Sequence, residues 1–140
     1  MKIKIKKLDS GATLPSYAHP GDAAMDMYAL EQTVLRPGVQ QAVKTGIAME
    51  IPHGYAGLVW DKSGLAIREG LKTTGGVIDA GYRGEIMIGM INLSGKPYTF
   101  EAGHKIAQMI IQKVEACEIV EATELADSAR GEKGFGSTGK

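Results

Sequence analysis

Asp79 is the residue of this sequence best placed to do chemistry. It follows the apolar pair Val77-Ile78, and this short stretch has two glycines before it and two after it. Glycine lets a backbone approach a ligand closely, so a hairpin here could present its amides and carbonyls to a flat polar ring. Beside such a ring, the Asp79 carboxylate could act as a general base. The alternative is an aspartate that only caps a turn, a common role for aspartate beside glycine.

A cation, a hydroxyl and a glycine follow one another at Lys62-Ser63-Gly64, where the pattern predicts the start of a short helix. The first turn of a helix has free amides and the positive end of the helix dipole, which together attract anions. The stretch therefore predicts a contact with phosphate. The alternative is a capped surface turn, because the longer glycine-rich loop of the nucleoside triphosphatases is absent from it.

Two further polar side chains interrupt apolar stretches of the chain. Asp26 lies within residues 21–29, and Gln108 lies within residues 103–111. A carboxylate among apolar residues is costly unless it is paired or faces a wet site, so Asp26 predicts a charged partner. A buried amide needs hydrogen bonds, so Gln108 is either a satisfied core residue or a ligand contact.

The last fifteen residues, 126–140, differ in composition from the rest of the chain. They are rich in glycine and contain a single large apolar residue, Phe135. Such a segment cannot pack a core, and one interpretation is a frayed terminus. The other is a flexible arm that orders over a ligand, with charge from Arg130, donors from Gly136 and Ser137, and a stacking face from Phe135. An exposed ring in a polar tail favours the second interpretation.

Short strands are the elements that must position these residues. The chain has 140 residues, 44% of them hydrophobic, which suffices for one domain with its own core. Its 19 glycines indicate frequent turns. Alternating Lys and Ile at residues 2–6 and the apolar stretches 39–51, 55–60, 85–92 and 106–114 predict strands. We expect an all-β domain over residues 1–125, a sandwich or jelly roll of roughly ten strands, with at most one short helix, after Ser63.

Charge and cysteine content exclude several classes of protein. The 16 basic and 16 acidic residues balance, which argues against a nucleic-acid partner and leaves room for a local cationic pocket that binds a small anion. Cys117 is the only cysteine, so no internal disulfide can form, as is usual in a reducing compartment. No apolar run approaches the ~20 residues of a membrane span, and the start resembles no secretory signal. We expect a cytoplasmic protein with no membrane partner.

Five segments, taken together and in this order, resemble the five motifs of the trimeric dUTPase family over nearly the whole chain. They are residues 21–29, 62–66, 76–84, 103–108 and 130–139. Each is weak by itself, but their combined order and spacing is specific. The resemblance implies a jelly-roll-like (β-clip) fold and a homotrimer whose active sites lie between subunits. It also implies that residues 126–140 form a flexible arm that closes over the nucleotide.

The same resemblance implies a reaction, the hydrolysis of dUTP to dUMP and pyrophosphate, which supplies dUMP and keeps uracil out of DNA. Asp79 would deprotonate a water molecule that attacks the α-phosphorus, with Mg²⁺ bound across the triphosphate and no protein ligand to the metal. Asp26 would support the site without binding the metal. Tyr82 would pack beneath the deoxyribose. Uracil would be read by the backbone of residues 73–78, and the residues assigned to the base are Thr73, Val77, Ile78 and Met87. The residues assigned to the phosphates and to the closing arm are Lys62, Ser63, Gly64, Gln108, Arg130, Phe135, Gly136 and Ser137.

The chain departs from the usual pattern of the family at three places. Asp61-Lys62 stands where Pro-Arg is usual, Thr73 where several relatives carry Asn, and Lys133 where Gly is common. Lysine is a point charge rather than a planar bidentate donor, and Asp61 adds a carboxylate beside an anion site. We therefore expect activity with weaker phosphate binding.

Two other functions fit parts of the pattern. A dCTP deaminase of the same superfamily would carry a catalytic Glu five residues after the glycine that corresponds to Gly84, a place held here by Gly89. A non-catalytic nucleotide-binding regulator would be expected to show a degraded site. Asp79, Tyr82, Gln108 and the complete arm are all present, which favours the enzyme.

Overall fold

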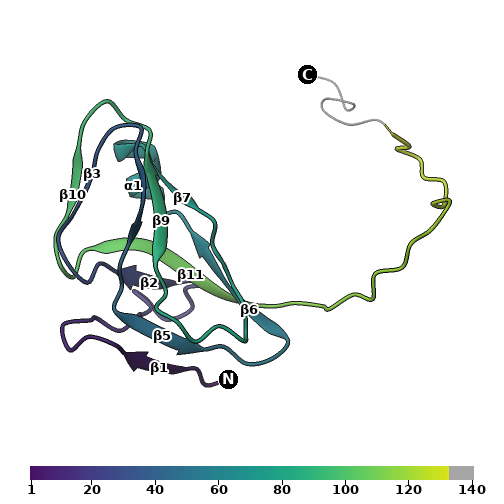
Figure 1. Ribbon diagram of the computed structural model, residues 1–140, viewed down its shortest axis with the longest axis horizontal. Helices are drawn as coiled ribbons and strands as arrows, with labels where there is room; N and C mark the ends of the chain where they lie inside the picture. Colours follow the sequence, from purple (N-terminus) through teal and green to yellow (C-terminus); the bar gives the residue numbers. More distant parts are fainter. Residues whose placement is uncertain (133–140) are drawn as a thin grey trace.

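The computed structural model describes residues 1–132 of the chain, and this part contains eleven short strands and one helix (Figure 1). In chain order they are β1 (Lys4–Lys7), β2 (Met25–Tyr28), β3 (Thr33–Leu35), β4 (Gln40–Val43), β5 (Ile47–Glu50), β6 (Tyr55–Trp60), α1 (Ser63–Glu69), β7 (Leu71–Thr74), β8 (Val77–Ile78), β9 (Ile88–Asn92), β10 (Tyr98–Phe100) and β11 (Lys105–Lys113). The prediction of an all-β domain with at most one short helix is confirmed, and the helix begins at Ser63 itself.

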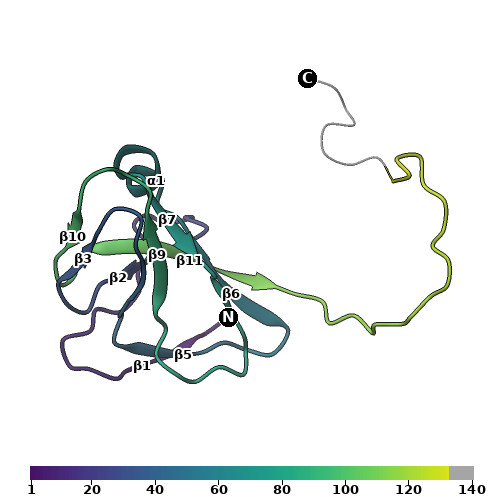
Figure 2. The same cartoon turned by 45° about the horizontal axis from the view of Figure 1, so that its top comes forward.

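The strands pair into four small antiparallel sheets. Their orders are β1-β5, β10-β3, β2-β11-β6-β8 and β4-β9-β7. The longest pairing joins β11 to β6, which run side by side in Figure 2. One predicted strand, residues 39–51, is in fact two, because the chain turns at Gly46, whose φ of 69° suits glycine, and β5 then pairs with β1.

The core lies between these sheets and follows the alternation of the strands. On β9, Ile88 and Met90 point inward and are almost fully buried, while Gly89 between them is only partly covered. Phe100 on β10 and Met109 on β11 have no exposed surface. Full burial of an apolar side chain of this size contributes about 1.5–3 kcal/mol, so these residues provide the body on which the site is built.

The helix is short because it is bounded on both sides. Lys62 before it is extended, and Gly70 after it adopts a left-handed φ of 67° and donates its backbone N–H to the carbonyl of Leu65. This is the usual glycine termination of a helix. The seven residues of α1 therefore form a short helical connection between β6 and β7.

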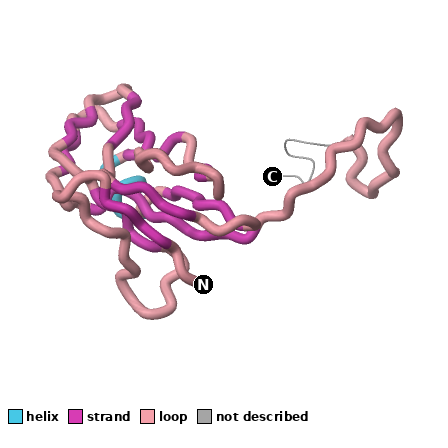
Figure 3. Tube along the Cα trace, turned by 60° about the horizontal axis from the view of Figure 1, so that its bottom comes forward, coloured by secondary structure: helices cyan, strands magenta, loops and turns pink. Residues whose placement is uncertain are grey.

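The chain leaves the body after β11. Residues 114–132 contain no strand or helix and extend away from the sheets (Figure 3). Of residues 114–125, which we predicted as part of the domain, Val114 donates its N–H to the Gly54 carbonyl at 2.9 Å, whereas Ile119 and Leu125 are 95% and 91% exposed. Arg130 belongs to this described tail, whereas Lys133, Phe135, Gly136 and Ser137 lie outside the described residues. Within residues 1–132 no helix is long and apolar enough to cross a membrane.

Candidate active site

The sheet β2-β11-β6-β8 brings three of the predicted segments together. On β11, Gln108 lies opposite Asp26 of β2 on one side and opposite Trp60 of β6 on the other. Residues that face each other on antiparallel strands carry their side chains on the same face of the sheet. The chain continues from Trp60 through Asp61 and Lys62 into α1, so this register places the predicted phosphate segment beside Asp26 and Gln108.

Asp26 is buried and is held by two lysines. Its residue is 5% exposed, Lys62 Nζ lies 2.5 Å from Oδ1, and Lys105 Nζ lies 2.7 Å from Oδ2. Burial by itself raises the pKa of Asp26. Hydrogen bonds and attraction from Lys105 and Lys62 together have the larger, opposite effect, so the pKa lies below the ordinary 3.8. A charged partner was predicted for Asp26, and the structure shows two, Lys62 and Lys105. Two cations and one carboxylate leave this cluster with one net positive charge, which suits an anion.

Lys105 is a member of the cluster that the sequence patterns did not single out. It stands three residues before Gln108, so a regular strand would place the two side chains on opposite faces. The pairing of β11 with β2 shifts register between Lys105 and Ala107, and this bulge turns Lys105 to the same hollow as Gln108. Hydrogen bonding to Asp26 raises the pKa of Lys105 above 10.5.

These residues line a hollow of about 360 Å³. Its walls include Asp26, Lys62, Lys105 and Gln108, together with the small residues before β2. The Gln108 side-chain amide donates one hydrogen bond to the Asp61 backbone carbonyl at 2.8 Å, which leaves its second N–H for a ligand.

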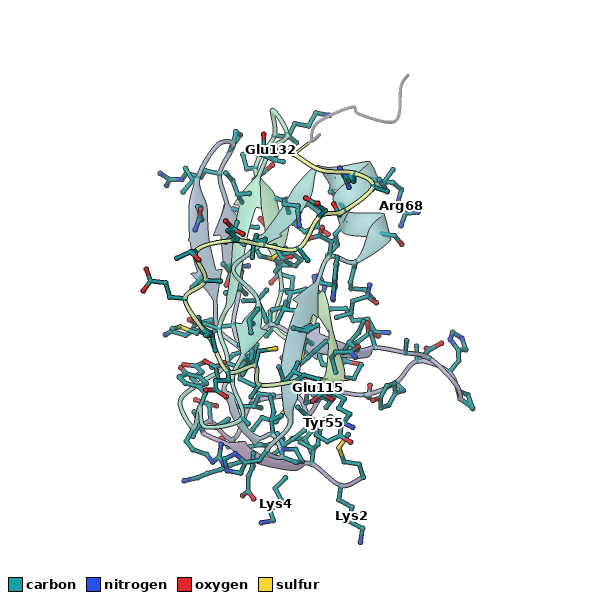
Figure 4. The ribbon with its side chains drawn as sticks, turned by 90° about the vertical axis from the view of Figure 1, so that its right-hand side faces the viewer. Lys2, Lys4, Tyr55, Arg68, Glu115 and Glu132 are labelled. Atoms are coloured by element: carbon teal, nitrogen blue, oxygen red, sulfur yellow. The ribbon has the colours of Figure 1, made fainter. Side chains whose placement is uncertain are left out.

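An adjoining hollow of about 210 Å³ shares Lys62 and Lys105 and adds Gly64 and Arg68. The Arg68 guanidinium folds back over Gly64, where a Cβ would lie 2.7 Å from its Nη2 atom. Figure 4 shows Arg68 on α1 at the opposite end of the body from Lys4. Ser63 is exposed and begins α1 between Lys62 and Gly64.

The segment predicted as a hairpin, which keeps that name below, consists of β7, the turn at Gly75-Gly76 and β8. Its two strands do not pair with each other, because β7 pairs with β9 and β8 pairs with the edge of β6. The Val59 N–H donates to the Gly76 carbonyl at 2.8 Å, and Val77 lies opposite Leu58. Gly75 and Gly76 have φ values of 71° and 113°, and a Cβ on Gly76 would lie 3.0 Å from the Val59 carbonyl. Both glycines are therefore needed to make the turn and to bring it close to β6.

Asp79 follows the hairpin with its carboxylate unengaged. Its backbone carbonyl accepts a hydrogen bond from the Tyr82 N–H at 3.0 Å, which makes the turn, and the Tyr82 hydroxyl donates to the Glu85 carbonyl at 2.9 Å. Within residues 1–132 the Asp79 carboxylate itself makes no hydrogen bond or ion pair, so it does not cap this turn. The hollow beside it measures about 220 Å³ and is lined by Val77, Ile78, Asp79, Tyr82, Glu85, Ile86 and Met87.

Asp61 and Thr73, two of the departures from the family pattern, contact each other. Asp61 Oδ1 accepts hydrogen bonds from the Thr73 backbone N–H at 2.6 Å and from its hydroxyl at 2.7 Å. Asp61 Oδ2 lies 2.8 Å from Lys72 Nζ. Burial raises the pKa of Asp61, and these partners on β7 lower it below 3.8 overall. The Asp61 carboxylate thus faces β7 and pairs with Lys72, and it does not line the hollow of Asp26 and Gln108.

The predicted site residues thus form two groups in one chain. Asp26, Lys62, Gly64 and Gln108 line the hollows at β2, β11 and α1, while Val77, Ile78, Asp79, Tyr82 and Met87 line the hollow at the hairpin. In the described part of the chain no residue lines both the hairpin hollow and either of the other two. Residues 1–132 also contain no group of three or more His, Cys, Asp or Glu that could hold a metal ion.

The family model of the dUTPases matches residues 10–139 of this chain. The chain belongs to the dUTPase family. Proteins named deoxyuridine 5'-triphosphate nucleotidohydrolase are 48% identical to it in Thermobifida fusca, over 99% of this chain and 79% of the relative, and 50% identical in Corynebacterium glutamicum, over 99% and 95%. The recognition of this enzyme family from the motifs is confirmed.

Solved dUTPases share the fold. The structure of Staphylococcus bacteriophage 80alpha dUTPase with dUPNHPP superimposes with a TM-score of 0.93 at 31% identity, covering 99% of both chains. A mutant of the dUTPase of phage phi11 of S. aureus, described with a structural Mg(II) ion, gives a TM-score of 0.83 at 27% identity, over 89% of this chain and 98% of that one. The predicted jelly-roll-like architecture of the dUTPase family is confirmed.

Proposed function

We propose that the protein hydrolyses dUTP to dUMP and pyrophosphate, and so supplies dUMP and keeps uracil out of DNA. Membership of the dUTPase family supports this reaction, and the 80alpha relative was solved with dUPNHPP, a dUTP analogue. The observation on which the mechanism rests is the unengaged Asp79 carboxylate at the rim of the hairpin hollow, within residues 1–132. A carboxylate without a partner can accept a proton from water, whereas one held by lysines is a poor base.

At the hairpin, Asp79 accepts a proton from the water molecule that attacks the α-phosphorus. Tyr82 lies under the deoxyribose and leaves no room for a 2′-hydroxyl. The backbone of residues 73–78 reads uracil, with Met87 nearby, and this fixed set of donors and acceptors rejects cytosine because buried polar groups would be left unpaired. The bond between the α-phosphorus and the bridging oxygen breaks, and pyrophosphate leaves.

At the other hollow, Lys62, Ser63, Gly64 and Gln108 hold the phosphates. Lys62 has one N–H on Asp26, so its remaining donors are available to an anion. Mg²⁺ bound across the triphosphate would withdraw charge from the phosphate oxygens in the reaction. The donor set fits an ion held by phosphates and water, because both oxygens of Asp26 are engaged with lysines. Arg130, Phe135, Gly136 and Ser137 close over the nucleotide from the tail.

The working unit in this proposal is a homotrimer whose sites combine residues of different subunits. The separation of the two hollows within one chain supports it, since each hollow holds only part of the residues that one nucleotide needs. Val77 and Met87 at the hairpin are 67% and 48% exposed, which leaves apolar surface for another chain or a nucleotide to cover.

The geometry at Gly89 argues against the alternative dCTP deaminase. A Cβ at this position would lie 2.6 Å from Thr74 Oγ1 and 2.7 Å from the Thr74 carbonyl, and the backbone oxygen cannot move without disturbing β7. The close pairing of β9 with β7 therefore has no space for the glutamate that the deamination would require.

Pyrophosphate release from dUTP, dCTP, dTTP and UTP, each with Mg²⁺, tests the proposal directly. We expect dUTP to react far faster than the other three. Ammonia release from dCTP would favour the deaminase, and binding of dUTP without turnover would favour a regulator.

A further inference from the structure

Asp61 connects elements that carry both groups of site residues. Its backbone carbonyl accepts the Gln108 amide from β11 at 2.8 Å, and the next residue, Lys62, binds Asp26 of β2. Its carboxylate turns to β7, where it binds Thr73 twice and Lys72 once. These contacts make Asp61 the junction between the end of β6 and the strand that leads into the hairpin.

The end of β7 that Asp61 holds also pairs with β9, where Thr73 lies opposite Met90 and Thr74 opposite Gly89, so the Asp61 carboxylate adds a second anchor at Thr73. Thr74 ends β7, and the next two residues are Gly75 and Gly76, both with left-handed φ values. Such glycines give a chain more conformational freedom, so the position of the turn depends on what anchors the residues before it. Thr73 is buried, and both its backbone N–H and its hydroxyl are bound by a single carboxylate oxygen.

We infer that Asp61 is a positioning residue for the base-reading hairpin: it fixes Thr73 and hence the turn that receives uracil. This inference rests on the proposed dUTP hydrolysis. The Asp61 side chain points away from the phosphate hollow, whose lining does not include it. The effect of changing this side chain should therefore fall on binding of the base and sugar, and not on binding of the pyrophosphate part of the substrate.

The test compares two small ligands that report on the two hollows separately. dUMP carries the base and sugar, and inorganic pyrophosphate carries only phosphate. By calorimetry, Asp61→Ala should weaken dUMP binding about tenfold or more, the size expected for lost hydrogen bonds to a charged group. Inhibition by pyrophosphate should be unchanged. Lys62→Ala should give the reverse pattern.

Three further variants separate positioning from general stability. Asp61→Asn keeps an acceptor oxygen for Thr73 and should retain more dUMP affinity than Asp61→Ala. Thr73→Val removes the hydroxyl bond to Asp61 and keeps the backbone one, so it should weaken dUMP binding less than Asp61→Ala does, and the double variant should be no worse than Asp61→Ala alone. Lys72→Gln is the matched control, because it removes only a half-exposed ion pair and should leave dUMP binding unchanged.

Several outcomes would overturn the inference. It fails if Asp61→Ala binds dUMP like the wild type, if dUMP and pyrophosphate weaken together, or if the changes at Asp61 and Thr73 are additive. Failure of the proposed function is distinct from these results: a wild-type protein that binds dUMP but releases no pyrophosphate from dUTP would refute the reaction. The dUMP measurements would still decide the role of Asp61.

Discussion

Each charged group in the cluster of Asp26, Lys62 and Lys105 has a partner in its own chain, whereas the Asp79 carboxylate has none within residues 1–132. The first arrangement follows from burial, because a buried carboxylate is costly unless cations and hydrogen bonds compensate it. The second follows from the chemistry proposed for Asp79, because a base must keep an oxygen available for a proton. Under the proposed function, the two regions would therefore separate binding, which is organised in advance, from catalysis, which needs an unengaged group.

The two regions also differ in how much of their surface is exposed. Asp26, at the centre of the cluster, is buried on β2 between its two lysines, while the hairpin lies at the edge of β6 with Val77 and Met87 exposed. A paired cluster is complete in one chain, but an exposed apolar rim becomes dry only when another molecule covers it. Under the proposed function, the difference would explain why the hollow proposed for the phosphates is structured in a single chain while the hollow proposed for the base is open.

The largest effect is expected from removing the unengaged carboxylate. Asp79→Asn should bind dUTP with near-normal affinity and lose turnover by roughly 10² to 10⁴-fold, the usual size of general base catalysis. Single-turnover pyrophosphate release together with calorimetric titration of dUTP would measure both quantities. Near-full turnover in this variant would mean that the hairpin carboxylate is not the base.

Complementation tests whether the site crosses between subunits. Chains that carry Asp79→Asn and chains that lack residues 126–140 should each form inactive trimers. Refolded together in equal amounts, they should place an intact Asp79 and an intact arm in about one quarter of the sites. Regained activity is the expected result. Demonstrated mixing of subunits without any activity would show that the arm serves its own chain or is dispensable.

A smaller effect is expected at the paired cluster. Lys62→Ala should weaken dUTP binding roughly 10- to 100-fold, because one hydrogen bond to a charged group contributes about 1.5–3 kcal/mol. The loss should shrink as salt concentration rises, because the contact is largely ionic. Lys44→Ala removes the same charge from a surface pair with Glu31 and is the control. If the wild type and the Lys62 variant bind dUTP equally well at low salt, Lys62 does not contact the phosphates.

The smallest effect concerns stability at low pH. Because the folded pKa of Asp26 is lowered, its ionised form stabilises the fold above pH 3.8, and this contribution is lost as the pH falls through the folded pKa. Asp26→Asn should therefore unfold more easily at pH 7, by about 1.5 kcal/mol for a lost charged hydrogen bond. As the pH falls, the stability of this variant should decrease less steeply than that of the wild type, because no carboxylate is left at this position to be protonated. Urea unfolding at several pH values measures both.

Glu50→Gln is the matched control for this last prediction, because Glu50 forms an exposed ion pair with Lys4, and such pairs contribute little. Parallel pH profiles for the Asp26 variant and the wild type would mean that Asp26 is not stabilised by its two lysines.

Local patterns were sufficient for much of the fold. Residues 55–60 form β6 as predicted, because apolar residues between turn signals favour a short buried strand, and α1 begins at Ser63. The stretch 39–51 was less well predicted, since the turn at Gly46 divides it into the two strands β4 and β5. The stretch 85–92 becomes a strand only at Ile88, because the Ile86 N–H bonds instead to the carbonyl of Ile47 on β5.

The sequence by itself determined the class of fold, the dUTPase motifs and the need of Asp26 for a partner, because strand alternation, glycine turns and the cost of a buried charge are local properties. Only the tertiary structure decided that the partners are Lys62 and Lys105, that a bulge in β11 turns Lys105 toward Asp26, and that Asp61 faces β7. These contacts depend on the register between strands distant in sequence, and a shift of one residue would turn each side chain to the other face.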